Sequence, residues 1–265
     1  DIDGEAAMLV ESYAKRNRKV LVVLADVSKT GMIAPSLSLA QEMKERYPDS
    51  VEILVDACQF RLKPMNLRIY LENGFMVAVT GSKFLTGPTF SGALLVPSSL
   101  GHIHPSDPEQ NIGLLLRWEA ALAEFRMFLK APESRVENFL MRFADAIMNR
   151  LHEDPGFEPL PVPELERPHH GWDNVQTIFP FRLKRKGRFL DMSEAKRIQS
   201  MLSEDLSHVS KHAGFRYSLG QPVSCGALRI CSSARLAVEG MENGNAVIDR
   251  ALHALDKTAW LIDLA

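Results

Sequence analysis

The first hundred residues alternate between apolar runs typical of strands and apolar spacings typical of helices. The runs that predict strands are continuous and cover residues 19–25, 51–56, 75–81 and 91–97. Helical spacing occupies residues 6–17, 36–47 and 66–73. Strand–helix–strand alternation with short connections predicts an α/β fold with a mostly parallel sheet. Because "KVLVVLA" (19–25) is a continuous run with several β-branched residues, we expect this first strand to be covered on both faces.

The second half of the chain has a different pattern. Long helices are predicted at Ile112–Leu129 and 133–151, and a proline cluster at 153–171 marks a linker. Four elements follow it: strands at 177–183 and 227–233, and helices at 193–206 and 246–262. We expect a large-domain portion over residues 1–130 and a smaller α+β C-terminal domain over residues 131–265.

Composition and charge narrow the class of protein. Of the 265 residues, 46% are hydrophobic and 24% are charged, as in globular proteins, and the net charge of -2 does not suit a nucleic-acid partner. No apolar run approaches the ~20 residues that a membrane span needs. The three cysteines (Cys58, Cys225 and Cys231) form neither a disulfide framework nor a zinc motif. With no signal peptide in the sequence, we expect a cytoplasmic protein without a membrane or metal partner.

An acid and a lysine follow two of the predicted strands. Asp56 ends "VEILVD", and Lys83 comes just after "VAVTGS". In open α/β sheets, ligands bind beyond the carboxyl ends of the strands. A lysine that loses its proton forms Schiff bases with carbonyls, and a carboxylate holds a proton on a ring nitrogen, so the pair suits a pyridoxal cofactor. The alternative is that Lys83 is a loop lysine and Asp56 a helix N-cap.

The stretch around this pair resembles a known cofactor segment. "VDACQ", the 27 positions from Asp56 to Lys83 and "TGSKFLTGPTFSGALLVP" resemble pyridoxal-phosphate enzymes of fold type I. The closest likeness is to the class V aminotransferase group, which includes cysteine desulfurases and kynureninases. The resemblance implies that Lys83 forms the internal aldimine, that Asp56 pairs with the pyridine nitrogen, and that Gln59 bonds the phenolic oxygen. It also implies that Thr80 and Ser82 contact the phosphate.

Two further positions match this family outside the central motif. Ser28, in "ADVSKTGMIAP", falls where a polar residue often approaches the cofactor ring. Arg229, in "ALRICSSARLAVE", matches the arginine that binds the substrate carboxylate, and a guanidinium suits that role because it binds a carboxylate in bidentate fashion. The alternatives are that Arg229 forms a local ion pair, or that Arg235 binds the carboxylate.

The family also has features that do not match this chain. Nothing before residue 19 resembles its phosphate loop or its ring-stacking aromatic, so the chain looks like the C-terminal part of such an enzyme. Ser82 stands where cysteine desulfurases have histidine, and residues 99–113 do not resemble the loop that supplies a phosphate contact from the partner subunit. The resemblance implies a homodimer that binds pyridoxal 5'-phosphate and an amino acid, as an aminotransferase. The alternatives are a desulfurase- or kynureninase-like lyase and a non-catalytic partial chain.

Other residues with possible chemistry have simpler interpretations. Cys225 suggests a persulfide carrier, but a desulfurase cysteine lies on a longer, earlier loop. His169 and His170 lack acidic or cysteine partners at ligand spacing, so we expect an exposed loop. "RLKRKGRF" at 182–189 predicts a solvated hairpin or loop. The apolar stripe at 114–128 predicts core and dimer surface.

Overall fold

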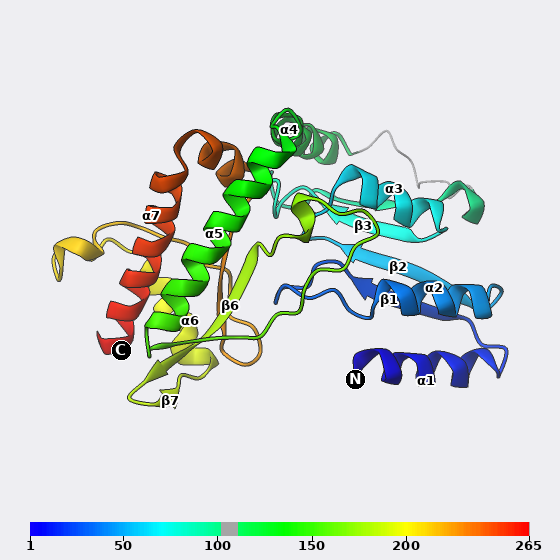
Figure 1. Ribbon diagram of the computed structural model, residues 1–265, viewed down its shortest axis with the longest axis horizontal. Coiled ribbons are helices and arrows are strands. Elements are labelled where there is room, and N and C mark those ends of the chain that lie inside the picture. The colour runs from blue at the N-terminus through cyan, green and yellow to red at the C-terminus, as the bar shows by residue number, and fades with distance from the viewer. Residues whose placement is uncertain (102–110, 265) are drawn as a thin grey trace. The chain divides into compact units, whose positions relative to one another are not determined.

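The computed structural model describes residues 1–101 and 111–264, and its contacts divide the chain into two units (Figure 1). The first unit comprises residues 1–28, 32–130 and 164–174, and the second comprises the remaining segments, 29–31, 131–163 and 175–265. We call residues 164–174 the return segment, because they rejoin the first unit from within the proline-rich stretch. Most of the loop at 99–113, which the sequence predicts to lack the phosphate contact, lies outside the described residues.

The first unit is built on a four-stranded sheet in the order β1-β2-β3-β4. Its strands are β1 (Val20–Ala25), β2 (Val51–Ala57), β3 (Met76–Thr80) and β4 (Gly92–Leu95). β2 pairs in parallel with both β1 and β3, whereas β4 runs antiparallel to β3. Each strand falls on a predicted apolar run, and the prediction of a mostly parallel α/β sheet is confirmed.

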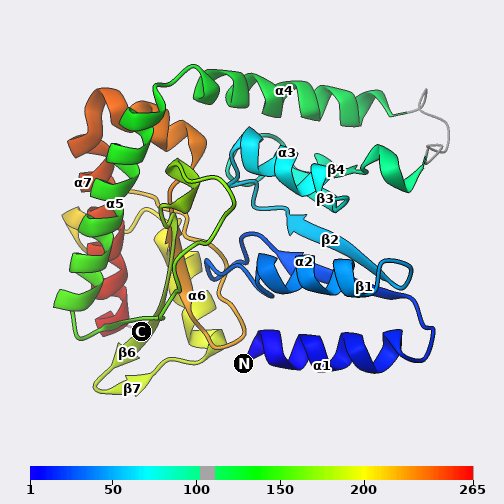
Figure 2. The same cartoon turned by 45° about the vertical axis from the view of Figure 1, so that its right-hand side comes forward.

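Four helices accompany this sheet in the described part of the unit: α1 (Ile2–Ala14), α2 (Leu37–Arg46), α3 (Pro64–Glu72) and α4 (Ile112–Leu129). α2 and α3 connect successive parallel strands and lie on the same side of the sheet (Figure 2). Ser36 caps α2, because its side chain accepts a hydrogen bond from the Leu39 N–H at 3.2 Å. Pro64 occupies the first turn of α3, where its missing N–H costs nothing.

The two faces of the sheet bury different amounts of apolar surface. Val22, Leu24 and Ile53 are buried on the side of α2 and α3. On the opposite side, which we call the open face, Leu21 and Val23 are 54% and 49% exposed. The prediction that "KVLVVLA" is covered on both faces is therefore wrong. The strand is apolar on both sides, but the helices of the described chain cover only one of them.

The second unit contains two long helices, α5 (Glu133–Glu153) and α7 (Ala234–Leu264), that pack together. Gly240 of α7 makes close approach possible, since a Cβ atom there would lie 2.2 Å from the ring of Phe139. Asn243 interrupts α7 with non-helical backbone angles. The sequence pattern places a helix from residue 246, and the part of α7 before the kink corresponds to the helix that the family resemblance implies after the strand of Arg229.

A small antiparallel sheet completes the second unit. Its strands are β5 (Phe157–Pro159), β6 (Ile178–Arg185), β7 (Arg188–Phe189) and β8 (Leu228–Cys231), with β6 pairing to the other three. Lys186 and Gly187 adopt positive φ at the turn between β6 and β7, so the predicted hairpin at 182–189 is confirmed. α6 (Met192–Leu202) begins with a capping box formed by Asp191 and Glu194. Single 3₁₀ turns occur at Ser98–Leu100, Trp172–Asn174 and Lys211–Ala213.

Candidate functional site

Asp56 lies near the carboxyl end of β2, on the open face of the sheet. In the parallel register it pairs with Ala25 of β1 and Ala78 of β3, so it shares its face with the exposed side chains of β1. Its Oδ1 atom accepts a hydrogen bond from the backbone N–H of Cys58 at 3.1 Å. This contact is a local Asx turn, which holds the carboxylate at the end of the strand.

Lys83 lies in a tight turn that begins where β3 ends, and its side chain is exposed. The carbonyl of Lys83 accepts a hydrogen bond from the Thr86 N–H at 3.0 Å, which closes the turn. On the strand side, the hydroxyl oxygens of Thr80 and Ser82 lie 2.9 Å apart. The Ser82 N–H also donates to Thr80 Oγ1 at 3.3 Å. Two hydroxyls beside an ammonium group form a set of donors that suits a phosphate.

Two glycines let this turn pack tightly against α4. A Cβ atom on Gly81 would lie 2.3 Å from the Cβ of Ala121 and 3.0 Å from the Oγ of Ser91. A Cβ atom on Gly87 would lie 2.6 Å from the same Ala121 atom. The Gly87 N–H donates to the Gly81 carbonyl at 2.9 Å, so the two glycines also join the ends of the turn. The position of the lysine turn therefore depends on residues without side chains at these two points.

The acid turn and the lysine turn are joined by the backbone. The Phe84 N–H donates to the Gln59 carbonyl at 3.3 Å, which links the residue after Lys83 to the predicted cofactor motif of β2. The thiol of Cys58 lies close enough to both Asp56 and Lys83 for each to affect its pKa. Burial, a hydrogen bond with the Asp56 side chain and the Asp56 charge raise the pKa of the Cys58 thiol to about 12, while the charge of Lys83 acts in the opposite direction. The structure therefore brings Asp56, Gln59 and Lys83 together at the carboxyl ends of β2 and β3.

The outlying predicted residues have their own local contacts. The Ser28 hydroxyl accepts a hydrogen bond from the Met32 N–H at 3.1 Å, within the loop after β1. Arg229 lies on β8 in the second unit and donates to the Gln221 carbonyl at 3.0 Å. Its place in the site therefore stays a prediction. Cys225 is exposed in a turn of the second unit.

A buried ionic cluster that the sequence did not predict lies beside the site. Asp26 follows β1 directly, and Arg167 of the return segment forms an ion pair with its carboxylate; both side chains are fully buried. Tyr70 of α3 donates its hydroxyl to Asp26 Oδ2 at 2.7 Å. Burial opposes the charge on Arg167, but attraction to Asp26 and Asp173 outweighs it and raises the pKa of Arg167. Asp26 had a detectable signal as a polar residue at a strand end, whereas Arg167 lies in the stretch interpreted as a linker.

An aromatic cluster was also missed. Trp172 of the return segment stacks on Phe84, with ring centroids 5.3 Å apart and an interplanar angle of 11°. Phe128 of α4 contacts both rings edge-on, at 4.9 Å from Trp172 and 5.3 Å from Phe84. Aromatic packing against Trp172 and Phe128 therefore holds Phe84 in place, next to Lys83 in the lysine turn. No local pattern in the sequence pairs these positions.

The described residues contain neither a cluster of metal ligands nor a helix suited to cross a membrane. They contain no group of three or more His, Cys, Asp or Glu side chains placed to hold a metal ion. Within the same residues, none of the helices combines the length and the apolar character that crossing a bilayer requires. His169, one of the two histidines considered for a metal, uses its backbone N–H to bond Asn66 Oδ1 at 2.8 Å.

Comparison with known proteins gives a clear result for the fold. The sequence matches no family model and no curated protein. A solved structure of a NifS-like protein aligns with 97% of this chain at a TM-score of 0.56 and 15% identity. One of SPT aligns with 97% at a TM-score of 0.52 and 19% identity, and a further SPT structure was solved with PLP. The NifS-like protein and SPT therefore each share the fold of this chain.

A decarboxylase domain from Vibrio parahaemolyticus gives a similar result. This glutamate decarboxylase domain of diaminobutyrate-pyruvate transaminase and L-2,4-diaminobutyrate decarboxylase aligns with 95% of the chain at a TM-score of 0.54 and 19% identity. The chain covers 65% of the NifS-like protein, 66% of the SPT chain and 50% of the decarboxylase domain. It therefore spans at most about two thirds of the length of these structures.

Proposed function

We propose that this chain is part of a pyridoxal-phosphate-dependent enzyme of fold type I that acts on an amino acid. The observation that carries the proposal is the link between two strand ends: the Phe84 N–H donates to the Gln59 carbonyl and so holds the turn of Lys83 beside that of Asp56. An amine and a carboxylate at neighbouring strand ends are the two groups that this cofactor requires. The solved structures that share the fold include one with PLP, which supports the same cofactor.

The residues present fit the cofactor in chemistry and in access. Lys83 is exposed, and Asp56 lies half-buried on the open face, so both are accessible to a ligand. Thr80 and Ser82 supply the hydroxyl pair for a phosphate, and Gln59 supplies an amide for a ring oxygen. When bound, pyridoxal phosphate supplies an aldehyde that joins amines and a ring that accepts electrons.

The residues of the chain divide the remaining work. Asp56 would hold a proton on the ring nitrogen of the bound cofactor through its negative charge, and Lys83 would move the proton at the substrate Cα. Arg229 binds the α-carboxylate of the substrate and so orients the bond that reacts. In detail we propose transamination of the class V type. A lyase reaction of the desulfurase or kynureninase type is the alternative, and Ser82 in place of histidine before the lysine disfavours the desulfurase.

A second candidate is a chain that needs a further polypeptide portion to complete the site. The open face supports it, because Leu21, Val23 and Leu94 are about half exposed on a sheet of a type that is usually covered on both sides. The partial coverage of the solved structures supports it too.

We also propose a homodimer, since Ile112, Leu115 and Leu116 of α4 are each about two thirds exposed.

Reductive trapping tests the proposal. Incubation with pyridoxal phosphate, reduction with borohydride and peptide mapping should label Lys83, and Lys83→Arg should remove the label. Lys130→Arg, at the exposed end of α4, is the matched control and should leave the label in place. Label on a different lysine would reject the assignment of Lys83. Absence of any label would favour the second candidate, in which the portion that completes the site lies outside this chain.

A further inference from the structure

The return segment contacts Phe84 in the lysine turn and Asp26, the residue that bonds the Asp56 backbone. Its eleven positions, 164–174, belong to the first unit although residues on either side belong to the second. The segment contains no strand or long helix, only a 3₁₀ turn at Trp172–Asn174. Several of its residues are exposed, but three side chains that contact the rest of the unit are deeply buried: Trp172 is 4% and Asp173 2% exposed, and the Arg167 side chain is fully buried.

One set of contacts, which we call the Arg167 arm, connects the segment to Asp56. Arg167 Nε donates to Asp26 Oδ2 at 3.2 Å and Arg167 Nη2 donates to Oδ1, so the guanidinium binds the carboxylate in bidentate fashion. The Asp26 backbone N–H donates to the Asp56 carbonyl at 2.9 Å. Arg167 is therefore two contacts away from the backbone that presents the Asp56 carboxylate.

A second set of contacts, which we call the Trp172 arm, connects the segment to the turn of Lys83. Trp172 stacks on Phe84, the residue that follows Lys83, and Phe84 makes the N–H bond to Gln59. Arg61 lies with its guanidinium 5.1 Å from the centroid of the same ring. Because Phe84 is fully buried, a movement of its ring would also move the turn that carries Lys83.

A third set of contacts fixes the segment itself. Asp173 Oδ2 accepts the Lys63 N–H and the Asn66 Nδ2 amide, each at 2.8 Å, at the start of α3. Asn66 is fully buried and exchanges two further bonds with the His169 backbone, both at 2.8 Å. The Arg167 arm and the Trp172 arm therefore start from a segment that hydrogen bonds hold against the start of α3.

From this arrangement we propose that the return segment sets the spacing between Asp56 and Lys83, with Arg167 and Trp172 as positioning residues. The importance of that spacing for catalysis rests on the proposed function, but the positioning itself does not. Neither residue needs to touch cofactor or substrate in this role. The segment comes from the part of the chain that leads into β6, so the site requires residues that lie far beyond the central motif.

Hydrogen exchange measured by mass spectrometry tests the positioning on the chain as it is. Trp172→Ala should speed exchange about ten-fold in the peptide that contains Phe84, with a smaller change at Asp26, because each arm acts on its own turn. Arg167→Met should speed exchange at Asp26 and Cys58 instead. Trp172→Phe retains a ring and should restore slow exchange. Trp260→Ala, in the second unit, is the control and should change neither turn.

The outcomes separate this proposal from the function on which its importance rests. If exchange at the two turns rises no more than the rise shared by the whole first unit in Trp172→Ala and Arg167→Met, the segment would be ordinary core and the proposal would be overturned. If a variant does not fold, Arg167→Lys or Trp172→Leu replaces it, since each keeps a bulky side chain but loses the bidentate pair with Asp26 or the ring stack on Phe84; no local change there would count equally against the proposal. A local change in exchange without any pyridoxal-phosphate label on Lys83 in the wild-type chain would reject cofactor binding by this chain alone and retain the positioning.

Discussion

The contact of Gly81 with α4 gives a prediction whose magnitude follows from distances. In Gly81→Ala the new Cβ would lie 2.3 Å from the Ala121 Cβ, whereas carbon atoms in contact prefer about 3.5–4.0 Å. The helix or the lysine turn must then move by about 1 Å or more. Overpacking of this kind costs about 1–3 kcal/mol of unfolding free energy.

A second substitution isolates the cause. Ala121→Gly removes the atom that Gly81→Ala strikes, but it costs about 1 kcal/mol as a helical glycine and about 0.8 kcal/mol as a lost methyl group. We expect the double variant to be only about as destabilised as Ala121→Gly alone. The two single costs would then exceed the double cost by about 1–3 kcal/mol.

Urea unfolding followed by tryptophan fluorescence measures these costs. A Trp260→Phe background leaves only Trp118 and Trp172, which both belong to the first unit. Gly92→Ala is the matched control, since no heavy atom lies within 4 Å of its Cβ position, and it should change stability by less than about 0.5 kcal/mol. Equal effects of Gly81→Ala and Gly92→Ala, or additive costs in the double variant, would refute the reasoning.

Four other expectations follow from the site. Asp56→Asn should keep the circular dichroism spectrum and lose most turnover in cofactor-loaded protein; undiminished turnover would remove Asp56 from the mechanism. Arg229→Ala should keep cofactor binding but weaken amino-acid binding by about 2–4 kcal/mol in a spectral titration, and an unchanged titration would turn attention to Arg235. Arg167→Met should lower the unfolding free energy by about 3–5 kcal/mol because it leaves a buried carboxylate without its cation, and adding Asp26→Asn should recover part of that loss in urea titrations. Because the Cys58 pKa is raised to about 12, its thiolate is scarce at neutral pH, so alkylation of Cys58 should be slow and should accelerate only above about pH 10; rapid labelling at about pH 8 would contradict this.

The elements of the first unit were largely predictable because their signals are local. The runs that became β1, β2 and β3 are continuous and apolar, and a strand needs only its own residues to show that pattern. Asp56 and Lys83 were recognisable for the same reason, since each follows such a run. The second unit was harder, because β5 and β7 are only 3 and 2 residues long and carry no periodicity.

The contacts around the site were not predictable in the same way. Trp172 stacks on Phe84, and Arg167 pairs with Asp26, across long separations in sequence, and such pairs leave no periodic trace. Most of the return segment also lies in the stretch at 153–171 whose prolines predict a linker, although its Arg167, Trp172 and Asp173 side chains are buried. Exposure of Leu21 and Val23 was missed because a strand can be apolar on two sides while only one side is covered.

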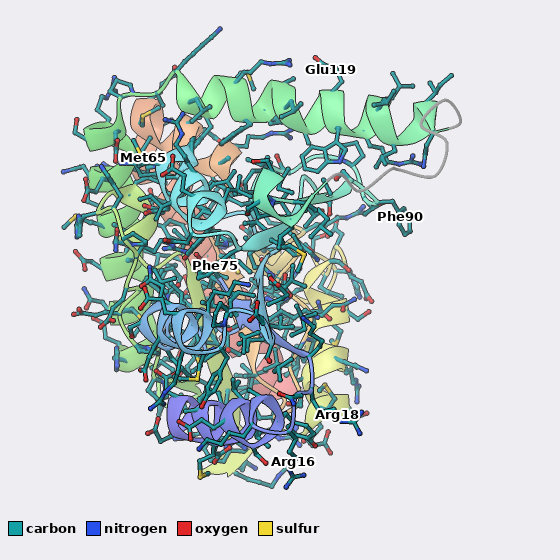
Figure 3. All side chains as sticks on the ribbon, turned by 90° about the vertical axis from the view of Figure 1, so that its right-hand side faces the viewer. Arg16, Arg18, Met65, Phe75, Phe90 and Glu119 are labelled. Carbon is teal, nitrogen blue, oxygen red and sulfur yellow. The ribbon has the colours of Figure 1, made fainter. Side chains whose placement is uncertain are left out.

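The open face has a consequence for how the chain behaves at high concentration. Among the described strands, β1 and β4 are the edges of the sheet; β1 bonds Ala34 only through Ala25 at its end, and it presents half-exposed leucine and valine. Phe90, at the other side of the sheet, is 83% exposed and projects away from the ribbon (Figure 3). An edge strand with apolar neighbours is a template on which a second chain can add its own strand. Colloidal stability of this chain therefore depends on keeping that edge covered, and a lysine in place of Leu21 would oppose strand addition while leaving the covered core of the sheet intact.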